Sequence, residues 1–389
     1  MSIPSAQSVP SANRTSDLRE LAQLFARLGT IAFGGPAAHI AMMEDEVVKR
    51  RGWLSPEGFL DMISACNLIP GPNSTEMALH IGHRRAGLIG LIVAGACFIV
   101  PAAAITIALA WAYVAFSKMP QLAGILYGIK PVIIAVVVQA IWRLARSAVH
   151  TNFLIALTAI AIAAAFAGVD EMVILLAAGI IAITVLRVRG TLTASPVIGT
   201  VVTAAKAGAI AAAPFSLGAL FLIFLKIGSV LFGSGYVLLA FLQSDLVDRT
   251  HWLTQAQLLD AVAVGQITPG PVFTTATFVG YLLDGNTGAI IATVGIFLPA
   301  FFFVSISGPL LPHVRRSPIA GAFLDGVNAG SFALMVEVTW QLGRAAIIDL
   351  PTLALAIVSA ILLLRFRLNS AWLIALGGVV GALVSAVPR

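Results

Sequence analysis

The chain has 389 residues, of which 59% are hydrophobic and 10% are charged, and its mean hydropathy is +0.99. Soluble domains carry about 25% charged residues, so the polar side chains are too few to cover a soluble core and the composition indicates a membrane protein. The net charge of +6 is spread over short loops, where it reports membrane orientation rather than nucleic-acid binding. Two cysteines, Cys66 and Cys97, predict neither a disulfide framework nor a metal site.

In chain order, residues 1–16 are rich in Ser, Pro and Asn, which predicts a disordered tail and not a cleavable signal peptide. Two transmembrane repeats follow, 17–189 and 216–389, joined by a linker at 190–215. Apolar stretches near the ~20 residues that span a bilayer predict an all-α fold with five spans in each repeat. The predicted spans are 17–43, 87–116, 121–147, 152–167 and 171–186, then 216–242, 286–311, 318–343, 350–364 and 370–387.

Between the first two spans of each repeat lies a segment too interrupted for one crossing, 55–85 and 254–283. We expect each to form a re-entrant helical hairpin. Ser55 before Pro56 and Thr254 before Gln257 are typical helix N-caps. The turns are predicted at Pro70-Gly71-Pro72 and Pro269-Gly270-Pro271, because proline cannot donate a hydrogen bond and pushes the preceding residue out of the helical region.

The second repeat restates the first. Arg27-Leu28-Gly29-Thr30-Ile31-Ala32-Phe33-Gly34 returns as Lys226-Ile227-Gly228-Ser229-Val230-Leu231-Phe232-Gly233, and Trp53-Leu54-Ser55 returns as Trp252-Leu253-Thr254. In an apolar chain, duplicated halves with helix-breaking Gly and Pro at matching positions point to a secondary transporter whose binding site lies at the repeat interface. Five spans per half is an odd number, so we expect the halves to have inverted topology. The exchange of Arg85 for Asp284 at aligned positions agrees with this, because Lys and Arg mark the cytoplasmic side.

Three duplicated segments carry a family resemblance. They are Phe33-Gly34-Gly35, Arg51-Gly52-Trp53-Leu54 and Ile69-Pro70-Gly71-Pro72-Asn73, each with its echo in the second half. Over residues 20–389 the chain resembles the chromate transporter family in its long, two-domain form. The resemblance implies a bacterial inner-membrane carrier that exports chromate, driven by the proton-motive force or linked to sulfate. It places Gly34, Gly35 and Gly233 among the substrate-binding residues, and Lys130 in the family-like stretch Gly128-Ile129-Lys130-Pro131.

The predicted hairpin turns also suit an oxyanion on chemical grounds, since a helix N-terminus presents free amides and a partial positive charge. The candidate substrate-binding residues of the turns are Pro70, Gly71, Pro72, Asn73, Ser74, Thr75 and Glu76, with Pro269, Gly270, Pro271, Thr274 and Thr275; Asn67 and Gln266 line the arms. The alternative is that these side chains only cap helices, with Glu76 closing a capping box on Asn73.

Aligned cations sharpen the prediction. Arg27 or Lys226 near a helix centre costs about 2.5 to 3.5 kcal/mol, which a bound dianion would offset. The alternative is that their long side chains snorkel to the interface. Intramembrane carboxylates are candidates for proton coupling, here Asp61, Asp260 and Glu337, or else structural hydrogen-bond acceptors. The run Glu44-Asp45-Glu46 is predicted to be a solvated helix end.

The sequence thus predicts a multi-pass inner-membrane carrier with no cofactor, no metal and no nucleic-acid partner. The expected partners are chromate or sulfate, the lipid bilayer and a second copy in a homodimer. No nucleotide-binding motif and no metal-ligand spacing of histidines is present in the sequence, so it supports neither ATP-driven transport nor a membrane enzyme. A sulfate or general oxyanion transporter and a passive anion channel remain alternatives.

Overall fold

The structure is a computed structural model that describes residues 14–117, 119–188, 214–232, 235–315, 317–366 and 368–386. Within these residues the regular secondary structure is helical throughout. The first half contains α1 (Arg14–Ile31), α2 (Gly35–Glu44), η1 (Asp45–Arg50), α3 (Pro56–Cys66), α4 (Asn73–Phe116), α5 (Pro120–Ala148), α6 (Asn152–Phe166) and α7 (Glu171–Val188). The second contains α8 (Leu217–Val230), η3 (Gly235–Val237), α9 (Leu238–Leu242), η4 (Gln243–Arg249), α10 (Gln255–Ile267), η5 (Val272–Thr274), α11 (Thr275–Arg315), α12 (Pro318–Ala346), α13 (Leu350–Phe366) and α14 (Ser370–Ala386).

The two predicted N-caps are confirmed. The Ser55 hydroxyl accepts a hydrogen bond from the Gly58 amide at 3.1 Å, directly before Pro56 at the start of α3. Thr254 and Gln257 form a reciprocal capping box at the start of α10. These side chains satisfy amides that the first helical turn leaves unpaired. Both helices therefore start where the sequence predicts.

The two longest helices are each folded back on themselves. The backbone leaves the helical conformation at Ala86–Gly87 in α4 and at Asp284–Gly285 in α11. Glycine pairs let the arms touch, since a Cβ added at Gly82 would lie 2.3 Å from the carbonyl oxygen of Gly90. Each helix thus consists of a short first arm, 73–85 or 275–283, and a long second arm that runs back alongside it.

Four helical segments of the described chain are long and apolar enough to cross a membrane: Asn73–Phe116, Gln121–Arg146, Val272–Ser307 and Pro318–Ala346. Shorter apolar helices occupy Asn152–Phe166, Glu171–Leu186, Leu217–Val230, Leu350–Phe366 and Ser370–Ser385. The continuous spans predicted at 17–43 and 216–242 are wrong. Helix α1 ends at Ile31, and the chain turns at Gly34 and Gly35, with φ angles of 106° and 76°, where α2 begins. Helix α8 likewise ends at Val230.

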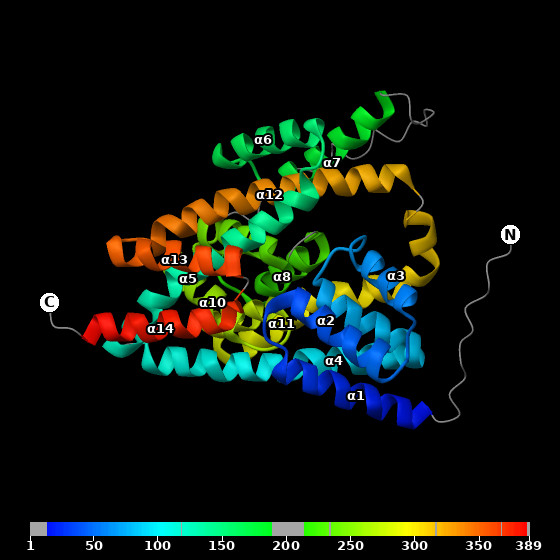
Figure 1. Ribbon diagram of the computed structural model, residues 1–389, viewed down its shortest axis with the longest axis horizontal. Helices are drawn as coiled ribbons and strands as arrows, with labels where there is room; N and C mark the ends of the chain where they lie inside the picture. Colours follow the sequence, from blue (N-terminus) through cyan, green and yellow to red (C-terminus); the bar gives the residue numbers. More distant parts are fainter. Residues whose placement is uncertain are drawn as a thin grey trace.

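The two halves pack reciprocally and are interlocked. Helix α1 packs against α4 as α8 packs against α11, while α5 packs against α13 and α14 as α12 packs against α6 and α7. In Figure 1, α12 runs beneath α6 and α7 at the top, and α1 lies alongside α4 at the bottom. Matched glycines permit the cross-half contacts: a Cβ added at Gly128 would meet the carbonyl oxygen of Gly377 at 2.0 Å, and one at Gly326 would meet that of Ala178 at 2.3 Å. Such close backbone approach is typical of helix pairs in membranes.

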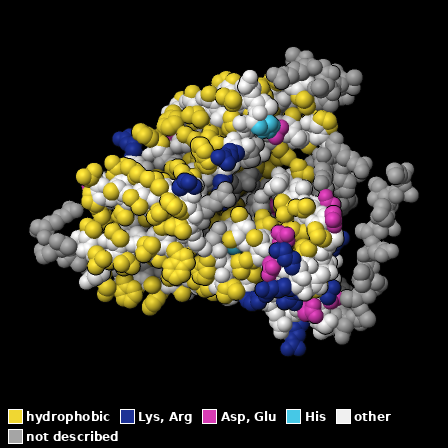
Figure 2. Space-filling view, in the orientation of Figure 1, with side chains coloured by type: hydrophobic (Ala, Val, Ile, Leu, Met, Phe, Trp, Pro, Cys, Tyr) yellow, Lys and Arg dark blue, Asp and Glu magenta, His cyan; other side chains and the backbone are white. Residues whose placement is uncertain are grey.

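The surface separates apolar from charged side chains. Figure 2 shows hydrophobic side chains over the left and upper parts, while charged side chains gather mainly at the lower right, over α1 to α3. Large apolar side chains are exposed on several helices; Leu350 is 77% exposed and Trp372 is 72% exposed. A soluble monomer rarely exposes apolar surface so extensively. This surface is that of a multi-pass membrane protein.

Candidate functional site

Two helical hairpins carry the Pro-Gly-Pro segments. In the first hairpin, α3 and the first arm of α4 run side by side: the Asn73 amide donates to Asn67 Oδ1 at 2.9 Å near the turn, and a Cβ added at Gly58 would lie 3.5 Å from the Arg84 guanidinium at the other end. The second hairpin consists of α10 and the first arm of α11. We call residues 69–76 tip 1 and residues 268–275 tip 2.

Glycine is required at the centre of each tip. Gly71 has a φ of 140° and Gly270 a φ of 84°, a region that L side chains rarely adopt. A Cβ added at Gly270 would also lie 2.5 Å from the Cβ of Ala102. The backbone of tip 2 therefore packs directly on the second arm of α4, in the opposite half.

Each tip is hydrogen-bonded to the end of the first long helix of the other half. The Gly71 amide donates to the Leu231 carbonyl at 2.8 Å, after the end of α8. The Gly270 amide donates to the Ala32 carbonyl at 2.9 Å, after the end of α1. The helix breaks and the hairpin tips, which are separate motifs in the sequence, thus meet at the interface between the halves.

Polar side chains surround this meeting point. The Tyr236 hydroxyl donates to Gln266 Oε1 at 3.2 Å, and it lies 3.9 Å from where a Cβ on Gly35 would be. A Cβ added at Gly34 would lie 3.9 Å from the side chain of Asn369. Gly233 lies outside the described residues. Tyr236 was not among the residues singled out in the sequence; its place directly after the second helix break is the signal that could have found it.

The predicted hydroxyl donors differ between the tips. In tip 2, Thr274 donates to the Pro271 carbonyl at 2.9 Å and Thr275 donates to the Val272 carbonyl at 2.8 Å, so both act as local caps. In tip 1, Ser74 and Thr75 are buried, and the Thr75 hydroxyl has no hydrogen-bond partner among the described residues.

The alternative of a capping box between Asn73 and Glu76 is not what the structure has. Helix α4 follows Pro72 without a side-chain cap, and the Asn73 amide is turned toward Asn67. Both carboxylate oxygens of Glu76 are buried without a hydrogen-bond partner among the described residues.

The aligned cations Arg27 and Lys226 form matching ion-pair clusters. Arg27 lies 2.5 Å from Glu46, and Lys226 lies 2.5 Å from Asp245, with both carboxylates at aligned positions. Arg50 and Arg249, aligned in the same way, add contacts of 3.0 Å and 3.3 Å to those carboxylates. A carboxylate of the protein thus offsets the charge that the sequence led us to assign to a bound dianion.

Glu46 corrects the prediction of a solvated acidic run. It is 6% exposed because η1 turns it toward α1. Burial raises the pKa of Glu46, but the hydrogen bond and charge of Arg27, together with Arg51 and Arg50, outweigh burial and leave the pKa below its ordinary value of 4.5. Glu46 and Asp245 were missed as candidates, although their alignment matches that of Arg27 and Lys226.

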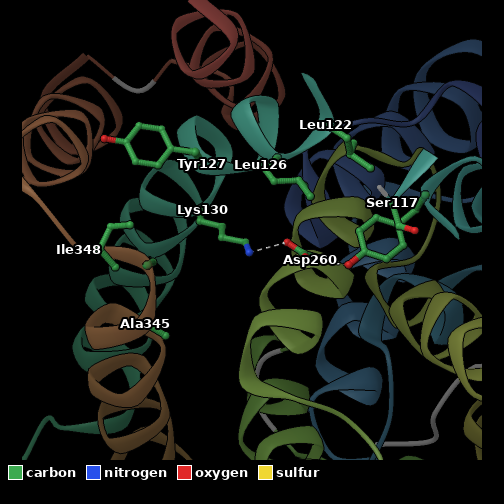
Figure 3. A pocket seen from close by; sticks show the side chains of 11 residues that line it. Ser117, Leu122, Leu126, Tyr127, Lys130, Asp260, Ala345 and Ile348 are labelled. Atoms are coloured by element: carbon green, nitrogen blue, oxygen red, sulfur yellow. Dashed lines mark hydrogen bonds and ion pairs between the residues drawn. The ribbon is translucent and has the colours of Figure 1, made fainter. Parts of the chain in front are cut away.

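A cavity of about 340 Å³ brings two other candidates together. Lys130 Nζ, from α5, lies 3.0 Å from Asp260 Oδ1, on the first arm of the second hairpin, and the Tyr113 hydroxyl donates to Asp260 Oδ2 at 2.8 Å. Figure 3 shows Lys130 reaching across the cavity to Asp260. The other residues that line the cavity are Ser117, Leu122, Ala123, Leu126, Tyr127, Ala345, Ala346 and Ile348. We call this cavity the Lys130 pocket.

The remaining coupling candidates lie elsewhere. Asp61, aligned with Asp260, is exposed, whereas Asp260 is 4% exposed. Glu337 accepts a hydrogen bond from Gln341 and lines a separate cavity of about 360 Å³ together with Glu171 and Arg249. Within the described residues, no group of three or more His, Cys, Asp or Glu side chains could hold a metal ion. The three carboxylates therefore do not form one site.

Comparison with known proteins places these features in a family. The family model described as chromate transporter matches residues 19–183 and again 218–382, once for each half. The chromate transport protein of Cupriavidus metallidurans is 31% identical over 95% of this chain and 94% of its own length, and that of Pseudomonas aeruginosa is 34% identical over 85% and 83%. An uncharacterized transporter of Methanocaldococcus jannaschii is 26% identical over 92% of both. No solved structure matches the chain significantly. The protein is a transporter, not an enzyme, and it belongs to the chromate transporter family.

Proposed function

We propose that the protein is a secondary active transporter that exports chromate across the bacterial inner membrane and so confers chromate resistance. The observation that carries this proposal is the family match over both halves. The relatives named chromate transport proteins align with this chain over most of their own length. The chain keeps both repeats, so it has the two tips and the two helix breaks from which an alternating-access site is built.

The oxyanion passes between tips 1 and 2 in this proposal. Support comes from the reciprocal hydrogen bonds of Gly71 and Gly270, which hold each tip against the broken helix of the other half. Irregular backbone is tolerated at membrane depth only where protein or a water-filled cavity surrounds it. Inverted repeats with re-entrant hairpins account for this arrangement, because an inversion exchanges the roles of the two tips when the carrier changes its open side.

Lys130 supplies the positive charge on the route. The side chain of Lys130 is 20% exposed, and the side chain of its partner Asp260 is 6% exposed. A dianion that enters the Lys130 pocket competes with Asp260 for the ammonium, and Tyr113 then stabilises the released carboxylate through its hydroxyl. Asp260 and Gln266 lie on the same helix, about 9 Å apart at 1.5 Å per residue, so one wall of the pocket belongs to the helix that leads into tip 2.

Arg27 and Lys226 have a second role in this scheme. Their ion pairs with Glu46 and Asp245 hold η1 and η4 against α1 and α8, directly before the helix breaks. In this scheme the two cations hold in place the helix breaks after α1 and α8, which the tips contact. They do so in addition to contacting the anion directly, the role predicted from the sequence.

Everted inner-membrane vesicles from a bacterium that produces the protein test the proposal. Energised vesicles should accumulate chromate, a proton uncoupler should abolish accumulation, and excess sulfate should compete if the site recognises any tetrahedral dianion. Vesicles without the protein are the control. Accumulation of sulfate but not chromate would favour the sulfate or general oxyanion transporter. Accumulation in right-side-out vesicles alone would reverse the proposed direction.

A further inference from the structure

Glu76 is a fully buried acid in tip 1. The residue is 0% exposed, and neither carboxylate oxygen has a hydrogen-bond partner among the described residues. It takes part in none of the ion pairs found within them. Asp260 and Asp245, by contrast, are buried acids that face a lysine. An ionised carboxylate buried without a partner is far more costly than a neutral one, so Glu76 carries a proton in this conformation.

The surroundings of Glu76 contain little that would hold a charge. A Cβ added at Gly71 would lie 2.5 Å from Glu76 Oε1, so the carboxyl group rests against the backbone of tip 1. The second arm of α11 contributes Ala300 and the end of α8 contributes the Leu231 backbone next to the same glycine. The buried thiol of Cys66, at the end of α3, is a titratable group on which Glu76 acts electrostatically. His80, on the same arm as Glu76, is one turn further along.

The matching position of tip 2 cannot titrate. Thr275 aligns with Glu76, and its hydroxyl is satisfied by the Val272 carbonyl at 2.8 Å. The two tips thus differ in their ability to titrate: tip 1 has a proton-binding group, and the matching residue of tip 2 is neutral. A carrier that moves a proton with its substrate needs such a group where the substrate passes.

We propose that Glu76 binds the coupling proton, and that the oxyanion occupies the tips only while Glu76 is protonated. This inference rests on the proposed function. When tip 1 separates from Leu231, the carboxyl group reaches water and exchanges its proton; when tip 1 closes, the proton is sealed in. A dianion beside an ionised Glu76 is repelled, so one proton and one dianion cross in the same direction. The transfer moves one net negative charge outward, which an inside-negative membrane potential favours.

The substitution Glu76→Gln tests the inference, because glutamine keeps the shape of the protonated acid but cannot release a proton. Purified protein in liposomes would be given a chromate gradient, with internal pH and chromate measured together. The wild type should move about one proton per chromate, and the Glu76→Gln variant should move chromate without protons. Glu57→Gln removes an exposed acid from the same hairpin and serves as the matched control, with an unchanged ratio. An unchanged ratio in Glu76→Gln would overturn the inference.

Chromate binding provides a second readout if Glu76→Gln does not transport. The ratio of the wild-type and variant dissociation constants, measured at each pH, removes the titration of chromate itself. Above the pH at which Glu76 ionises, wild-type affinity should fall relative to the variant by on the order of tenfold per pH unit, because one proton is linked to binding. A ratio that does not change with pH would also overturn the inference. Absence of chromate transport by the wild type would instead refute the proposed function.

Discussion

The ion pair between Lys130 and Asp260 allows a structural role to be separated from a role in transport. Three variants are needed: Lys130→Gln, Asp260→Asn and the double substitution. Removing one partner of a buried ion pair costs about 3 to 5 kcal/mol, because the other charge is left uncompensated. The Lys130 side chain is one-fifth exposed to solvent, and the Asp260 carboxylate also accepts a hydrogen bond from Tyr113, so each charge is partly stabilised without its partner. We therefore expect each single variant to lose about 3 kcal/mol, the low end of that range. The double variant leaves no charge unpaired and should regain most of that stability.

Transport should follow a different pattern across the same variants. A charge-assisted hydrogen bond contributes about 1.5 to 3 kcal/mol, so loss of the Lys130 ammonium should weaken oxyanion affinity by roughly 10- to 150-fold. The double variant lacks that ammonium too, and its transport should stay impaired although its stability returns. Unfolding of the purified protein in detergent measures stability, and chromate uptake into liposomes measures affinity. A double variant that transports like the wild type would show that the pair is structural and would refute the assignment of Lys130 to the substrate.

Three further predictions test the topology, the tips and the ion-pair clusters. Single cysteines at Arg84 and Asp284, which are exposed at matching turns, should be labelled from opposite sides of the membrane; labelling from one side would contradict an inverted repeat. Gly270→Ala should abolish transport because its φ of 84° does not suit a side chain, whereas Gly321→Ala, which has open space around it in a helix, should leave transport intact. If both variants transport equally, tip 2 is not critical. The pKa of Glu46 lies below its ordinary 4.5, so its ion pairs stabilise the fold at neutral pH and lose that effect as the pH falls below about 4.5. The pH midpoint of acid unfolding should therefore shift in Glu46→Gln. An unchanged midpoint would contradict the pairing.

Local signals in the sequence predicted much of this fold. The duplication and both N-caps depend on Gly, Pro, Ser and Thr at defined positions, where backbone geometry leaves few alternatives. The breaks after α1 and α8 were missed, because apolar residues continue on both sides of Gly34 and hydropathy does not register a turn. The local signal of this turn is the motif Phe33-Gly34-Gly35, because glycine readily adopts the positive φ that both Gly34 and Gly35 have.

Contacts between distant residues could not be predicted in the same way. Lys130 and Asp260 are in different halves, and nothing near either residue specifies the other. Glu46 lies in an acidic run that is typical of a solvated helix end, and its burial depends on the π-helical turn of η1 toward Arg27. The alternative role of Glu76, closing a capping box on Asn73, does not occur, because Asn73 pairs with Asn67 across the turn instead. In each case tertiary packing decided between two local alternatives.

Counterflow of chromate is the most direct test of a carrier with an alternating site between the two tips. Liposomes that contain the purified protein are loaded with unlabelled chromate and diluted into a trace of radiolabelled chromate. A carrier predicts that labelled chromate accumulates transiently inside above its external concentration, because exchange through one site outpaces net loss, and that Gly270→Ala abolishes this overshoot. Equilibration without an overshoot would show a passive anion channel, and an absence of protein-dependent chromate flux would contradict chromate transport itself.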